Sequence, residues 1–166
     1  LAETQKTIFR TDKQISENIL TNLFSGYEKQ KDLLLITAST DTSGIAKGTL
    51  KDDLEKLTKD TFTSQLSAPK LKILLDSIPG EIDYIDGIKD VQTQPRKTFY
   101  LLKDKNYLPN LTKEQRDKIN KEAVLAIRPQ LNTEWENYKA TIAAGKEPLP
   151  FDFDLAKEIF NVRVSE

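Results

Sequence analysis

The chain has 166 residues, 37% of them apolar and 31% charged, with a net charge of −1. This length supports one core without staples, and the near-neutral charge argues against general nucleic-acid binding. Because Cys, His and Met are all missing, disulfides, thiolate nucleophiles and imidazole bases or metal ligands are excluded. In addition, no apolar run approaches the ~18 residues of a membrane span.

A first helix is predicted from about Asp12 to at least Lys29. Thr11 and Gln14 have the spacing of a capping box, which marks helix starts. Apolar side chains then recur at four-residue steps, typical of one helix face; these are Ile15, Ile19, Leu23 and Tyr27. Residues 32–40 either extend this helix or form a buried strand. We favour the helix, because no convincing partner strand is evident.

Two further helices are expected before residue 92. Residues 40–48 are small and turn-forming, so we predict a loop there and a second helix capped by Thr49. A third helix begins near Pro69, since proline is favoured in the first helical turn. Pro79 and Gly80 stop or bend it, and isoleucines at three-residue steps favour a continuation to about Val91.

The longest apolar stripe lies in the second half of the chain. Residues 98–108 form either a short helix or an extended crossing, after which a second capping box at Thr112 and Gln115 opens a long helix. The stripe keeps its phase through Pro129, so we predict one kinked helix, ending near Gly145. We expect its tryptophan to lie in the core. The stripe consists of Val124, Ile127, Leu131, Trp135, Tyr138 and Ile142.

The last 19 residues, 148–166, differ in character. Pro148 and Pro150 keep their segment out of a helix. A dense apolar patch follows, capped by an aspartate at position 152 or 154. Val162 and Val164 alternate with polar residues in a strand-like ending.

Together these patterns predict an all-α protein. We expect an antiparallel up-down helical bundle of about four main helices over residues 1–147, the last of them kinked at Pro129. Residues 148–166 form an irregular, proline-tethered tail that either packs on the bundle or serves as a docking arm.

Motifs for catalysis and metal binding are incomplete. The segment beginning at Asp41 resembles an aspartic-protease loop, but Ser43 stands at the third position, where that loop needs Gly. The segment also occurs once, whereas such a site needs two carboxylates; we interpret it as a turn. Asp83 and Asp86 precede Gly87, but the first and last ligands of a calcium loop are missing. We therefore expect no catalytic residue, cofactor or metal.

Two charged blocks follow one another in the middle of the chain, a pattern that favours docking on a charged partner. The acidic block is Glu81, Asp83, Asp86 and Asp90, and the basic block is Arg96, Lys97, Lys103 and Lys105. With Phe151 and Phe153 of the tail, these are the candidate partner-binding residues.

We expect a non-catalytic interaction protein that docks on a larger protein assembly, as an accessory or extrinsic subunit or a secreted binding module. One alternative is a carboxylate-dependent hydrolase of polysaccharides, with two acids ~5–10 Å apart in a cleft. Another is a carrier of a small hydrophobic ligand, held between helices; its candidate lining is Phe24, Phe62, Trp135 and Tyr138. Missing thiols slightly favour an extracytoplasmic location, and the oligomeric state stays open.

Overall fold

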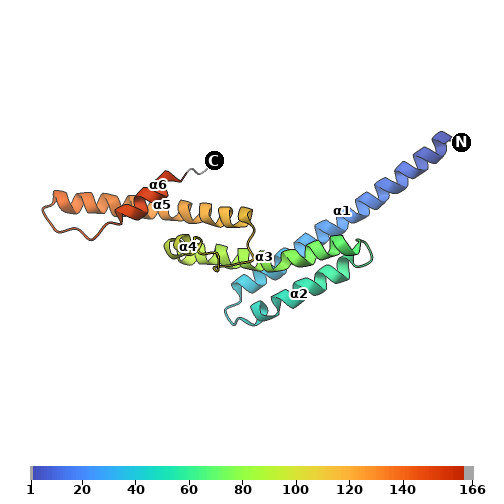
Figure 1. Cartoon of the computed structure of the whole chain (residues 1–166), viewed down its shortest axis with the longest axis horizontal. Coiled ribbons are helices and arrows are strands. Elements are labelled where there is room, and N and C mark those ends of the chain that lie inside the picture. The colour runs from blue at the N-terminus through green and yellow to red at the C-terminus, as the bar shows by residue number, and fades with distance from the viewer. Residues whose placement is uncertain (1, 163–166) are drawn as a thin grey trace. The chain divides into compact units, whose positions relative to one another are not determined.

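The computed structural model describes the backbone of residues 2–162 and the side chains of residues 14–162. Over this part of the chain there are six helices and no strand (Figure 1), which confirms the predicted all-α class. The four long helices are α1 (Ala2–Thr40), α2 (Ile45–Phe62), α3 (Ala68–Thr93) and α5 (Lys113–Ala143). The two short ones are α4 (Pro95–Leu101) and α6 (Phe153–Asn161).

The chain divides into two compact units, Leu1–Ile82 (unit 1) and Asp83–Glu166 (unit 2). Helices that are neighbours within a unit run antiparallel, as α1 and α2 do, so the predicted up-down arrangement is confirmed. None of the described helices has the length and apolar character that crossing a membrane requires.

The core of unit 1 lies mainly between α1 and α2. The ring of Phe62 is fully buried, 4.5 Å from the ring of Phe24 and 4.9 Å from that of Tyr27. Burial of such apolar surface is the main force that pairs the two helices. Ile15 and Ile19 are each 52% exposed, so the early part of the predicted stripe does not pack against the described residues.

Two predicted helix starts are wrong. α1 begins at Ala2, so Thr11 lies within the helix; its side chain falls outside the described residues. The preceding residues are mostly good helix formers, which explains the earlier start. α2 begins at Ile45 rather than after Thr49, because the Asp41 carboxylate accepts the backbone N–H of Ala46 at 2.9 Å and satisfies that helix end.

The segment before α2 is a turn, as interpreted from the sequence. Gly44 has φ 76°, a backbone conformation that favours glycine. The Asp41 carboxylate also accepts hydrogen bonds from the backbone N–H and the hydroxyl of Ser43. The bonds from Ala46 and Ser43 lower the pKa of Asp41. Residues 32–40 belong to α1, as favoured.

In the middle of the chain, α3 forms as predicted, and residues 98–108, for which a short helix and an extended crossing were both possible, begin as a helix. α3 passes through Pro79 and Gly80 and reaches Thr93, so the favoured continuation is confirmed. α4 covers the start of the next segment, and turns follow it. The guanidinium of Arg116 donates hydrogen bonds to the carbonyls of Leu102, Tyr107 and Leu108 at 3.2, 2.7 and 3.0 Å, and so holds these turns against α5.

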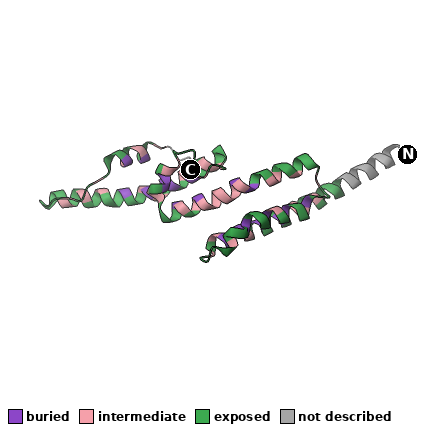
Figure 2. Cartoon of the chain, turned by 60° about the horizontal axis from the view of Figure 1, so that its bottom comes forward, coloured by how far each residue is buried: buried purple, intermediate pink, exposed green. Residues whose placement is uncertain are grey.

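α5 is the central helix of unit 2, in contact with both α4 and α6. Both halves of the Thr112–Gln115 capping box are formed, and the helix runs through Pro129, as predicted. Its buried face packs with residues of the other helices of unit 2, drawn in purple in Figure 2. The core consists of Val91, Phe99, Ile119, Ala123, Val124, Ile127, Leu131, Leu155 and Ile159. Burial declines along the stripe: Leu131 is buried, Trp135 half-buried and Ile142 exposed.

The tail is irregular only in part. Residues 144–152 lack regular structure, and Gly145 has the positive φ of 70° expected after a helix end. Nine residues then form α6, whose predicted cap Asp152 accepts the backbone N–H of Leu155 at 2.9 Å. Val162 ends α6 in an extended conformation, but no strand forms up to that residue, and Val164 lies outside the described residues.

Candidate functional site

The C-terminal part of α6 is fixed by side chains of α5 and of the segment after α4. At its C-terminal end, the guanidinium of Arg128 donates hydrogen bonds to the backbone carbonyls of Ile159 and Val162. A cation there also interacts favourably with the helix dipole. Lys103, which follows α4, forms an ion pair with Glu158. These bonds, with the buried Leu155 and Ile159, set where the remaining face of α6 lies.

Four aromatic rings cluster where the tail returns to α5. Trp135 and Tyr138 lie three residues apart on α5 and stack, with centroids 5.6 Å apart and an interplanar angle of 15°. Phe151 of the connecting segment and Phe153 of α6 meet edge to face at 5.0 Å. All ring pairs among these four have centroids 5.0–6.0 Å apart. Such offset and edge-on contacts stabilise the cluster beyond area burial.

Beside these rings lies a groove of about 360 Å³, which we call the aromatic groove. It is lined by Leu131, Asn132, Trp135, Phe151, Phe153, Ala156, Lys157 and Phe160. Phe153 is 54% exposed and Phe160 47% exposed. The groove therefore has an apolar floor, open aromatic edges and two polar side chains, Asn132 and Lys157.

Unit 1 has a smaller groove of about 280 Å³ between α1 and α3. It is lined by Leu20, Phe24, Leu66, Lys70, Ile73 and Leu74. With a single ring and mostly aliphatic walls, it offers fewer of the aromatic anchors that are enriched at interfaces.

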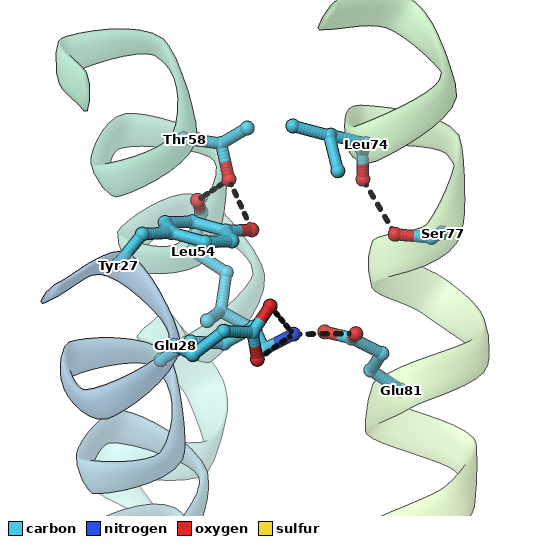
Figure 3. Close-up of polar contacts among 8 residues, drawn as sticks. Tyr27, Glu28, Leu54, Thr58, Leu74, Ser77 and Glu81 are labelled. Carbon is cyan, nitrogen blue, oxygen red and sulfur yellow. Dashed lines mark hydrogen bonds and ion pairs between the residues drawn. The ribbon is translucent and has the colours of Figure 1, made fainter. Parts of the chain in front are cut away.

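A polar layer crosses unit 1 in the C-terminal half of α1 (Figure 3). The Lys31 ammonium lies 2.9 Å from carboxylate oxygens of both Glu28 and Glu81. Burial opposes the charge on Lys31, but the hydrogen bonds to the two glutamates outweigh it and raise the pKa of Lys31. In the same layer the hydroxyls of Tyr27 and Thr58 are 3.0 Å apart, and Thr58 donates to the Leu54 carbonyl.

The predicted acidic block is occupied by contacts within the chain. Glu81 belongs to the polar layer of unit 1. Asp83 accepts the backbone N–H of Asn110 at 2.9 Å, and Asp90 accepts the hydroxyl of Tyr107 at 2.6 Å. Burial, and next the hydrogen bond to Asp90, raise the pKa of Tyr107. Asp86 also has an interaction partner. These carboxylates hold α3 and the turns before α5.

The predicted basic block is divided between structure and surface. Arg96 forms an ion pair with Glu134 at 2.6 Å. Lys103 pairs with Glu158, and its ammonium lies 5.1 Å from the ring centroid of Phe99. Lys97 and Lys105 are exposed. Two of the four basic side chains are thus engaged in unit 2 itself.

Of the predicted partner-binding residues, Phe151 and Phe153 are the two that line the aromatic groove. The expectation of a core position for Trp135 is wrong, because the ring is half-buried and lines the same groove. Sequence reasoning placed Phe160 in the dense apolar patch of the tail but not among the binding candidates, and it missed Lys157. Their spacing from Phe153 carried a signal, since residues four and seven apart share a helix face.

The sequence left two alternative functions, a carboxylate-dependent hydrolase and a carrier of a small hydrophobic ligand, and the structure bears on each. No described acidic side chain lines either groove, and no described cluster of acidic residues is suited to hold a metal. Of the acids on α5 and α6, Glu134, Glu136 and Glu158 are ion-paired. The rings expected to line a carrier cavity are divided: Phe24 and Phe62 belong to unit 1, Trp135 and Tyr138 to unit 2.

Comparison with known protein families, curated proteins and solved structures gives no match for this chain.

Proposed function

We propose that the chain is a non-catalytic interaction module that docks on a protein partner through the aromatic groove. The observation that carries the proposal is a set of half-exposed aromatic side chains held on two packed helices. Tryptophan and other aromatic residues are enriched at binding hot spots, where rigid rings add contact area at little cost in entropy.

The open form of the groove favours a protein over a small molecule. Pockets for small molecules bury about 70–90% of the ligand surface, whereas Phe153 and Phe160 leave this groove open along one side. An apolar face of a partner helix or loop needs only such an open groove. Trp135, Phe153 and Phe160 would act as anchors, with Lys157 and Asn132 at the polar rim.

A second candidate function is the binding of a small apolar ligand. The groove volume of about 360 Å³ lies within the range of about 300–1,000 Å³ found for ligand pockets. Trp135 is the chain's single tryptophan, so its emission reports directly on the groove. Saturable quenching or a blue shift of this emission with a neutral apolar ligand such as toluene would favour this candidate.

The test of protein docking is site-specific photo-crosslinking. A photoreactive phenylalanine analogue is placed at position 160 and, as a control, at position 45, since Ile45 is an exposed residue of α2. We expect a discrete protein adduct from position 160 and none of the same mass from position 45.

A second substitution links the adduct to the groove. Phe153→Ser, which alters an exposed side chain, should remove most of the adduct formed at position 160. Equal adducts at both positions, or an adduct that survives Phe153→Ser with unchanged yield, would contradict docking in this groove.

A further inference from the structure

We propose that the aromatic groove of one copy binds the outer face of α1 of a second copy, so that the chain self-associates. The outer face of α1 is defined here as Lys29, Asp32, Leu33 and Ile36. This inference rests on the proposed function, because it takes the aromatic groove as a protein-docking site and names its occupant.

The outer face of α1 carries two exposed apolar side chains. Leu33 is 64% exposed and Ile36 is 57% exposed, although α1 buries Leu35 and Ala38 on its other side. Residues three apart lie one above the other on a helix, so the two exposed side chains form one apolar ridge. An apolar ridge laid into an open groove is a recurring mode of helix recognition.

Charges on the two surfaces match in sign and spacing. On α1, Lys29 precedes Asp32 by three residues; on α6, Asp154 precedes Lys157 by three residues. When the two helices lie side by side in the same direction, Lys29 meets Asp154 and Asp32 meets Lys157. All four side chains are exposed, and none forms a salt bridge with another described residue.

The apolar parts then meet in the same register. Leu33 and Ile36 follow Asp32 on α1 as Phe160 follows Lys157 on α6, so the ridge lies level with the C-terminal end of α6, beside the ring of Phe160 at that end of the groove. Complementary charges around an apolar centre fix register and suppress wrong partners. The matched signs favour a second copy of this chain over an unrelated apolar helix.

The contact joins two different surfaces, so it is heterologous. Each copy offers one groove and one outer face. Two reciprocal contacts close a dimer, whereas contacts that do not close give an open chain of copies. In both cases the mass in solution rises above the 18.9 kDa of one copy.

Sedimentation velocity of the full chain over a range of concentrations gives the first test. We expect reversible, concentration-dependent association. Ile36→Ser and Phe160→Ser should each weaken it by about tenfold or more, because each removes an anchor of the contact. Ile45→Ser is the matched control, an exposed isoleucine outside both surfaces, and should leave it unchanged. Circular dichroism checks that the variants keep their helix content.

Charge reversal gives the second test. Asp32→Lys and Lys157→Asp should each weaken self-association by about tenfold at low salt, since each places like charges together. A mixture of the two variants should associate like the original chain, because the reversed α1 face of one variant then meets the reversed groove of the other. Failure of the mixture to associate would overturn the proposed register.

The outcomes separate this inference from the proposed function. A chain that is monomeric at all concentrations, while position 160 still forms a groove-dependent adduct with another protein, overturns the second copy as occupant and leaves the docking function standing. A monomeric chain without any adduct overturns both. Self-association that persists in both Ile36→Ser and Phe160→Ser overturns the inference, because it then uses other surfaces.

Discussion

The two units are held together by different means. In unit 1, long regular helices pack directly on one another, and the polar layer around Lys31 lies between them. In unit 2, short helices and turns are fixed by side chains that bind backbone carbonyls, above all Arg116 and Arg128. Regular packing leaves unit 1 with an exposed helix face, whereas the fixed return of the tail gives unit 2 a shaped aromatic groove.

The largest expected effect is in the core of unit 2. Leu131→Asp should lower the free energy of unfolding by about 3–5 kcal/mol, because it buries an unpaired charge at a position that is 0% exposed. Leu125→Asp on the same helix is the control; its side chain is 43% exposed, so we expect a loss below about 1 kcal/mol. Urea denaturation measures both. Equal losses would contradict the packing of α5 against α6.

The polar layer of unit 1 should be the next most sensitive feature. Lys31→Met leaves two glutamates without their shared cation, and we expect a loss of about 2 kcal/mol near neutral pH. Because folding raises the pKa of Lys31 above its ordinary value of 10.5, the stabilisation is complete below that pH and is lost as the pH rises through the folded pKa. The difference in the free energy of unfolding between the original chain and Lys31→Met should therefore shrink between neutral and strongly alkaline pH, as denaturation would show. A constant difference would contradict the ion triad.

The carbonyl contacts of unit 2 predict a smaller loss. Arg128→Met removes the charged donor at the end of α6 while keeping a long apolar stem, and we expect a loss of about 1–2 kcal/mol. Hydrogen exchange should locate this loss in α6 and leave the amides of α1 and α2 unchanged. Faster exchange in α1, with α6 protected as before, would show that Arg128 does not fix the tail.

Alanine substitutions at two helical glycines, one in each unit, should change stability in opposite directions. A Cβ at Gly87 would lie 2.5 Å from Cδ1 of Ile119, so Gly87→Ala should destabilise unit 2 by about 1 kcal/mol through overpacking. Gly26 has nothing within 4 Å of such a Cβ, so Gly26→Ala should stabilise α1 by about 0.5–1 kcal/mol. Thermal melting of both variants tests this pair, and two shifts of the same sign would contradict it.

Sequence patterns are sufficient where local signals decide the structure. The capping box at Thr112 and the unbroken stripe through Pro129 predict α5 correctly, because both act within one helix. The start of α1 is missed because the capping pattern at Thr11 also fits inside a helix. The start of α2 is missed because Asp41 satisfies the backbone of Ala46 from outside the helix.

The groove is only half predictable. Phe151 and Phe153 are identified as binding candidates from the dense apolar patch of the tail. The stripe also indicates which side of α5 is apolar, but not how far along α5 a covering element extends. Nine residues of α6 cover Ile127 and Leu131 and leave Trp135 at the edge. How far α6 extends along α5 is set by Arg128 and by the segment that connects the two helices. The contacts of Arg128 join residues that are distant in sequence.

The most direct test of the account is the accessibility of Trp135, the single tryptophan. Acrylamide quenching of its emission is measured in the free chain and in the complex with the partner captured at position 160. We predict efficient quenching in the free chain and clearly reduced quenching in the complex, because the partner then covers the groove. A stable complex in which Trp135 is quenched as readily as in the free chain would contradict docking in the aromatic groove.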